Sequence, residues 1–141
     1  MTIPLWVLLA FALWTLATLL ATVGVYRWRR ILTRRVAIRE FKFDSIAGHE
    51  DWYRRAMRAH ANCVENLPVY GAIALILGVA RLDTPALDAL AIALMLARVA
   101  QTVVHVAFVE TNTTVSVRFG FFAAQMAAMI AMSVIIIARL A

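Results

Sequence analysis

The residues best suited to chemistry are Arg58, Asn62 and Glu65, which stand four and three positions apart in an otherwise apolar stretch. On a helix that advances about 100° per residue, they fall within about 60° of arc on one face. Glu65 is the only formal charge from residue 59 to residue 80, and a carboxylate at membrane depth costs roughly 2.5–3.5 kcal/mol. A guanidinium, an amide and a carboxylate on one face would fit a zwitterionic ligand, so we expect this face to point inward.

A second polar face is centred on Arg98, the only formal charge from residue 89 to residue 109. Gln101 and His105 follow it by three and seven positions, again within about 60° of arc. Polar groups at membrane depth must satisfy one another or a ligand. We therefore expect Glu65 and Arg98 to be partners, either in an ion-pair network that fixes the helix register or, as we favour, in a ligand site.

The composition predicts that membrane helices position these two faces. Of the 141 residues, 64% are hydrophobic, against about 45–50% in a soluble domain, and the length allows one domain, residues 1–141. The net charge is +6, but ten of the 14 basic residues lie between Arg27 and Arg58, where membrane topology and anionic lipid explain them better than nucleic acid does. The one cysteine, Cys63, cannot form an intrachain disulfide or a cysteine metal pair, so no metal site is predicted.

Four apolar segments are each long enough to span a bilayer. They predict an all-α integral membrane four-helix bundle with spans at residues 3–26, 54–80, 86–109 and 117–139. The basic residues follow the first span rather than precede it, which argues against a cleaved signal peptide and favours a bacterial inner membrane. By the positive-inside rule the first connection is cytoplasmic and both termini lie on the non-cytoplasmic side. We expect Pro68 to kink the second span, Pro85 to suit the first turn of the third, and Thr114 or Ser116 to cap the fourth.

The bilayer setting limits the functions that these residues can serve. The sequence holds no Gly-rich phosphate loop, HExxH motif or nucleophile elbow, so the usual hydrolase and nucleotide-binding signatures are missing. Arginines, a carboxylate and amides near the cytoplasmic boundary suit a small anionic or zwitterionic cosubstrate that meets an apolar second substrate from the membrane. The alternative from a different class is a small transporter in which Glu65 exchanges protons with a cationic drug.

At these residues the chain resembles the MAPEG family, the membrane-associated proteins of eicosanoid and glutathione metabolism. The segment Arg58-Ala-His-Ala-Asn62-Cys-Val-Glu65, followed by Pro68, is similar to the family's R-A-x-x-N-x-x-E segment with its nearby proline. The four-span layout, the basic first connection, Arg98 with polar residues at +3 and +7, and an arginine that opens the fourth helix extend the likeness over essentially the whole chain. The resemblance implies a four-helix bundle, usually a homotrimer, that binds glutathione between neighbouring subunits.

The resemblance also implies a role for each polar residue. Arg118 would be the catalytic residue that stabilises the glutathione thiolate, and Arg27 would reach the ligand from a neighbouring subunit. The cofactor-binding residues would be Arg27, Arg58, Asn62, Glu65, Arg98, Gln101 and His105. The implied function is a glutathione-dependent transferase or peroxidase that joins the thiolate to a lipophilic electrophile in contact with membrane lipid. Because His105 stands where members with synthase activity usually carry tyrosine, a non-catalytic binding protein of the same fold is the third interpretation.

Overall fold

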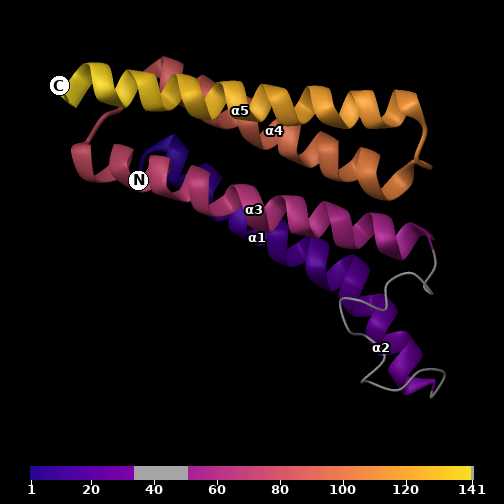
Figure 1. Cartoon of the computed structure of the whole chain (residues 1–141). Coiled ribbons are helices and arrows are strands. Elements are labelled where there is room, and N and C mark those ends of the chain that lie inside the picture. The colour runs from indigo at the N-terminus through magenta and orange to yellow at the C-terminus, as the bar shows by residue number, and fades with distance from the viewer. Residues whose placement is uncertain (34–50, 141) are drawn as a thin grey trace.

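Four long helices run up and down through the part of the chain that the structure describes, residues 1–33 and 51–140 (Figure 1). In this computed structural model the first span comprises α1 (Ile3–Thr18), a π-helix η1 (Leu19–Gly24) and α2 (Val25–Leu32), and the later spans are α3 (Asp51–Ala80), α4 (Pro85–Ala107) and α5 (Asn112–Leu140). All four spans are long and apolar enough to cross a membrane, so the predicted all-α four-helix membrane bundle is confirmed. The N- and C-termini lie at one end of the bundle (Figure 1). The predicted basic loop from Arg34 to Lys42 lies outside the described residues.

The first span continues past its predicted end and reaches Leu32 as one helix with a π-helical segment inside it. Within α1, the Thr18 hydroxyl donates to Trp14 O, four residues earlier, at 2.8 Å. Such back-bonding satisfies a hydroxyl in apolar surroundings and bends helices, and a π-helical segment widens the turn. The register after η1 places Arg27 so that its Nε donates to the Tyr53 hydroxyl on α3 at 2.8 Å.

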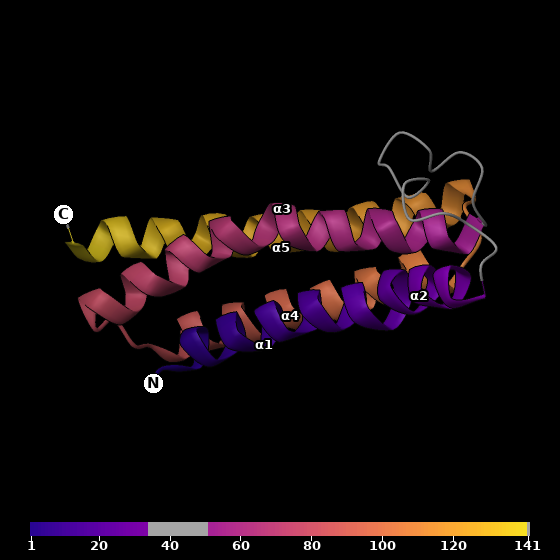
Figure 2. The same cartoon turned by 90° about the horizontal axis from the view of Figure 1, so that it is seen from below.

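The second span, α3, contains Pro68 and continues through it as one helix. A proline inside a helix removes one backbone hydrogen bond and bends the axis, and Figure 2 shows the C-terminal part of α3 turning away from α5. Beyond α3, Arg81 is left-handed with a φ of 54°, and the Leu82 N–H donates to Leu77 O at 3.0 Å, as in a Schellman turn. The next helix, α4, begins at Pro85, which lies in its first turn as predicted.

The fourth span, α5, begins earlier than predicted. We expected Thr114 or Ser116 to cap it, but the helix begins at Asn112, and both residues lie within its first turns. The Thr114 N–H donates to Thr111 Oγ1 at 3.2 Å, and the Thr111 N–H donates to Thr114 Oγ1 at 2.8 Å. This reciprocal pair resembles a capping box. It allows α5 to begin at Asn112 and not at a residue nearer to the predicted start. The shortened connection leaves Glu110 beside the start of α5.

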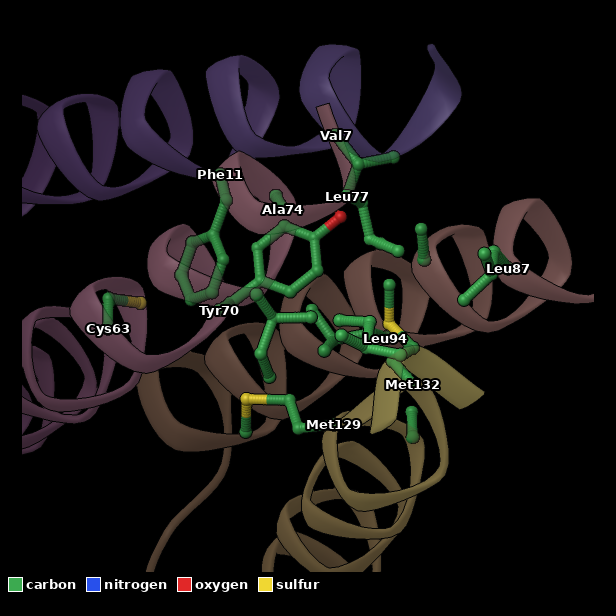
Figure 3. Close-up of a cluster of buried hydrophobic side chains, with 14 residues drawn as sticks. Val7, Phe11, Cys63, Tyr70, Ala74, Leu77, Leu87, Leu94, Met129 and Met132 are labelled. Atoms are coloured by element: carbon green, nitrogen blue, oxygen red, sulfur yellow. The ribbon is translucent and has the colours of Figure 1, made fainter. Parts of the chain in front are cut away.

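The core is an apolar cluster between the helices, and Figure 3 shows its side chains. Phe11 on α1 and Tyr70 on α3 are fully buried, with ring centroids 6.2 Å apart. The Tyr70 hydroxyl donates to Pro4 O at 2.9 Å, which ties the start of α1 to α3. Leu94 from α4 and Met132 from α5 complete the cluster. Large apolar side chains remain exposed on the outside of the bundle, as contact with lipid requires.

Candidate functional site

The candidate site is centred on the guanidinium of Arg118, in the second turn of α5. Its side chain is only 9% exposed, although α5 begins at the end of the bundle opposite the termini (Figure 1). Arg118 Nη1 lies 2.9 Å from His105 Nδ1, and Arg118 Nη2 donates to Glu110 Oε1 at 3.0 Å. These two contacts hold a positive charge in a fixed direction, in surroundings where a charge acts more strongly than in bulk water.

The contact with Arg118 determines the state of the His105 ring. A guanidinium has donors only, so His105 Nδ1 carries no proton and the neutral ring holds its hydrogen on Nε2. That Nε2 lies 3.2 Å from Asn62 Nδ2, and two donors cannot share one hydrogen bond, so the two amide atoms of Asn62 must be exchanged. The amide oxygen must therefore face the histidine, since amide oxygen and nitrogen are assigned from their hydrogen bonds. His105 on α4 thereby joins Asn62 on α3 to Arg118 on α5, and the amide nitrogen of Asn62 is left to donate elsewhere.

Glu110 bridges two arginines at the edge of the site. Besides the bond from Arg118, it accepts from Arg58 Nη1, at 3.2 Å to Oε1 and 3.4 Å to Oε2. The hydrogen bond from Arg118, and after it the charge of Arg58, lower the pKa of Glu110 below its ordinary value despite an opposing effect of desolvation. Glu110 was not among the predicted site residues. Its signal in the sequence is a lone carboxylate eight residues before Arg118, between the third and fourth apolar segments.

Two glutamines hold the backbone of Arg118 in place. The Gln101 side-chain amide donates to Arg118 O at 3.2 Å, and Gln125 Nε2 donates to Gln101 Oε1 at 3.0 Å. Both glutamines are buried, and an unpaired amide at that depth would be costly. Gln101, predicted to bind the cofactor, thus contacts the main chain at Arg118. Gln125 was not predicted; its signal was an amide in an apolar run, seven residues after Arg118 on the same helix face.

Arg98 lies apart from this network. It is 1% exposed, with its guanidinium carbon 5.2 Å from the centroid of the Phe11 ring, within the range of a cation–π contact. Its Nε and Nη2 have no hydrogen-bond partner in the described part of the chain. The expected ion pair with Glu65 is not among the ion pairs of residues 1–33 and 51–140. The reason is direction: Arg98 is buried between the helices, whereas Glu65 is exposed on the outside of α3.

Only part of the polar face of α3 points inward, whereas the sequence led us to expect this of all of it. Glu65 is exposed, Asn62 is half-buried, and the side chain of Arg58 is 66% exposed. The inward face of α3 is instead a stripe that includes small side chains. Its buried members near the site are Ala56, Ala59, Cys63, Asn66 and Tyr70. Small residues let helices approach closely, so this stripe packs against the neighbouring helices and leaves Glu65 on the outer surface.

Arg27 is held against the start of α3. Its Nε donates to the Tyr53 hydroxyl at 2.8 Å, and Tyr53 stacks on Tyr26 with ring centroids 4.2 Å apart. Trp52 meets Tyr26 edge-on, with centroids 5.2 Å apart. This aromatic cluster fixes the end of the first span against α3, and it orients Arg27 within its own chain.

A polar cleft of about 280 Å³ opens beside Glu110. Its walls come from the first turns of α3 and from the segment that follows α4, at Asp51, Arg54, Arg55, Arg58, Val109 and Glu110. The three guanidiniums outnumber the two carboxylates, and one of the carboxylates, Asp51, pairs with Arg54. Charge-assisted hydrogen bonds from arginine favour carboxylate and phosphate groups, so the cleft suits a small anionic group.

A comparison with family models matches residues 5–138 of the chain to the MAPEG family. The match covers nearly all of the 141 residues and includes the whole network around Arg118. Separate searches of curated proteins and of solved structures gave no match.

Proposed function

The chain belongs to the MAPEG family of membrane proteins, and from that premise we propose that it is a glutathione-dependent membrane enzyme. The reaction is the attack of the glutathione thiolate on a lipophilic electrophile that enters from the bilayer, as in a transferase or peroxidase. The sulfur of the cosubstrate is the nucleophile, so the protein needs none of its own. Its task is to bind the tripeptide, to favour the ionised thiol, and to keep that thiolate near the membrane interior.

The observation that carries the proposal is the oriented, buried guanidinium of Arg118. A cysteine thiol has an ordinary pKa of about 8.5, and its pKa must fall by about two for the thiol to be mostly ionised at neutral pH, which corresponds to about 2.7 kcal/mol. A guanidinium in a site with restricted water can supply an interaction of that size. Arg118 is held by His105 at 2.9 Å, so little reorganisation of the guanidinium is needed when a thiolate forms.

The residues around Arg118 supply partners for the charged ends of the tripeptide. Arg58 borders the cleft and would bind a ligand carboxylate. With its amide turned so that the oxygen accepts from His105 Nε2, Asn62 would donate to the same ligand from its amide nitrogen. Glu65 would accept from the ligand's ammonium group.

The exposure of Glu65 supports an assembly of several copies of the chain, which we propose to be a homotrimer from membership of the family. An ionised carboxylate that faces lipid is costly, and such groups almost always face the protein interior or a water-filled cavity. A second copy of the chain placed against α3 would cover Glu65 and enclose the ligand between subunits. Arg27 and Arg98 are also proposed to bind the cofactor. Neither hydrogen-bonds to Arg118 among the described residues of the single chain, so in the assembly each would have to reach the ligand from a separate position.

The test is the ultraviolet absorbance of the thiolate when glutathione is titrated with detergent-purified protein at neutral pH. We expect an increment that saturates at the concentration of sites and that disappears in Arg118→Ala, while Arg118→Lys retains part of it. Arg139→Ala removes an exposed arginine at the other end of α5 and serves as the matched control. An increment that is unchanged in Arg118→Ala would contradict the role of Arg118.

One observation favours the alternative of a proton-coupled transporter. Glu65 is exposed and forms no ion pair within residues 1–33 and 51–140, so its carboxylate is accessible to a cationic ligand. An efflux of cationic dyes that follows an imposed proton gradient and is lost in Glu65→Gln would support this function. Binding of glutathione without any thiolate increment would instead support a non-catalytic binding protein.

A further inference from the structure

Glu110 occupies the position that an anionic ligand of this site would need. Its carboxylate accepts from Arg118 Nη2 at 3.0 Å and from Arg58 Nη1 at 3.2 Å. These are the two guanidiniums that the proposed function assigns to the thiolate and to a ligand carboxylate. In the structure as described, both carry hydrogen bonds to an anion that belongs to the chain itself.

The surroundings of Glu110 and Arg118 show which of the two side chains is free to move. The Arg118 side chain is 9% exposed and is also bonded to His105, whereas the Glu110 side chain is 49% exposed. Glu110 lies between α4 and α5, outside both helices. Rotation of its side chain toward solvent would release both arginines without moving a helix, and hydration would compensate the released carboxylate.

We propose that Glu110 is a specificity-determining residue, an internal counter-ion that an anionic ligand must displace from Arg58 and Arg118. The identity of the ligand, glutathione, rests on the proposed function. The bridge itself is present in the structure without it. Binding is then an exchange of one anion for another at the same two guanidiniums. No covalent bond forms or breaks in this step.

The exchange discriminates between ligands by the contacts they make elsewhere. A small inorganic anion such as sulfate would replace the bonds that Glu110 already makes and would gain little. A tripeptide gains further contacts at Asn62 and Glu65, and these offset the displacement of the carboxylate. Glu110 therefore disfavours small anions in a cleft whose three arginines would otherwise attract them.

The experiment compares the wild-type chain with Glu110→Gln, and Asp83→Asn is the control. Asp83 is an exposed carboxylate in the segment between α3 and α4, so its removal changes the net charge equally without touching the site. Two quantities are measured on detergent-purified protein: the affinity for glutathione by calorimetry, and the rise in melting temperature with sulfate at constant ionic strength. We expect Glu110→Gln to bind glutathione about two- to fivefold more tightly and to be stabilised by sulfate, whereas wild type and Asp83→Asn are not stabilised.

The two measurements separate the inference from the proposed function. If glutathione binds to none of the proteins but sulfate stabilises Glu110→Gln selectively, the proposed function fails and the counter-ion role is upheld. If wild type binds glutathione, and Glu110→Gln shows neither tighter binding nor a sulfate effect, the proposed function is retained and the counter-ion role is overturned. Glu110→Ala is measured in parallel and supplies the same comparison if the glutamine variant does not fold.

Discussion

Arg118 Nη1 and His105 Nδ1 lie 2.9 Å apart on consecutive helices, and only the arginine can donate in this pair. The histidine is therefore a fixed acceptor that orients a buried cation. Its other nitrogen faces Asn62 at 3.2 Å, so one neutral ring connects three helices. A protonated His105 ring would place two cations side by side, so the contact with Arg118 requires the neutral ring.

Substitution of His105 tests this orienting role. His105→Asn keeps an acceptor near the position of Nδ1, whereas His105→Phe leaves Arg118 Nη1 buried without a partner. We expect the phenylalanine variant to lower the free energy of unfolding by about 1–3 kcal/mol, because an unsatisfied buried donor bears its full desolvation cost, and the asparagine variant to lower it by less. Denaturant unfolding in detergent measures both, and equal losses in the two variants would contradict the orienting role.

Arg98→Met tests whether Arg98 belongs to the site. Arg98 is buried beside Phe11 with two unpartnered nitrogens among the described residues, and methionine replaces this cost with an adaptable apolar side chain. We expect the variant to fold with unchanged or higher thermal stability and with little change in the thiolate increment. A large loss of glutathione binding in a folded Arg98→Met protein would instead place Arg98 in contact with the ligand.

Tyr70→Phe tests the tie between the first two spans. The Tyr70 hydroxyl donates to Pro4 O at 2.9 Å inside the core, and the ring stays in place in phenylalanine. We expect the free energy of unfolding to fall by about 0.5–1.5 kcal/mol, the net value of one hydrogen bond. Thermal unfolding followed by circular dichroism measures the change, and Tyr70→Leu, which also loses ring packing against Phe11, should cost more.

The bridge at Glu110 predicts a stability that depends on pH. The pKa of Glu110 is lowered in the folded chain, so its contribution is complete above the ordinary glutamate pKa and is lost as the pH falls through the lowered value. We expect wild type to lose stability on acidification more steeply than Glu110→Gln, with the difference confined to acid pH. Asp51, the other carboxylate of the cleft, is present in both proteins, so its effect cancels in the comparison. Parallel melting curves at every pH would contradict the bridge.

The four spans were predictable because the bilayer imposes length and apolarity on each segment independently of its neighbours. The start of α4 at Pro85 was predictable for a similarly local reason, since proline suits the first turn of a helix. The start of α5 was not predictable, because several adjacent polar residues could each have capped it. The reciprocal hydrogen bonds between Thr111 and Thr114 determine where the helix begins.

The direction of each polar face depended on packing that the sequence does not express. A carboxylate at membrane depth suggests burial, but small side chains occupy the inward face of α3 and leave Glu65 outside. Arg98, Gln101 and His105 share one face of α4, yet only the latter two meet Arg118. The contact of Glu110 with Arg118 depended in turn on where α5 begins.

The π-helical segment η1 has a consequence for how the length of the first span can vary among related proteins. A π-turn holds about one residue more than an α-turn for the same rotation. Removal of one residue from Leu19–Gly24 would therefore allow the segment to rewind as an α-helix while the residues on either side keep their register, and Arg27 would stay beside Tyr53. Removal of one residue elsewhere in the first span would instead rotate everything on one side of it by about 100° and break the alignment with the stacked rings at the start of α3. We expect natural single-residue deletions in the first span to fall within this stretch, and those outside it to be accompanied by a change in the aromatic cluster.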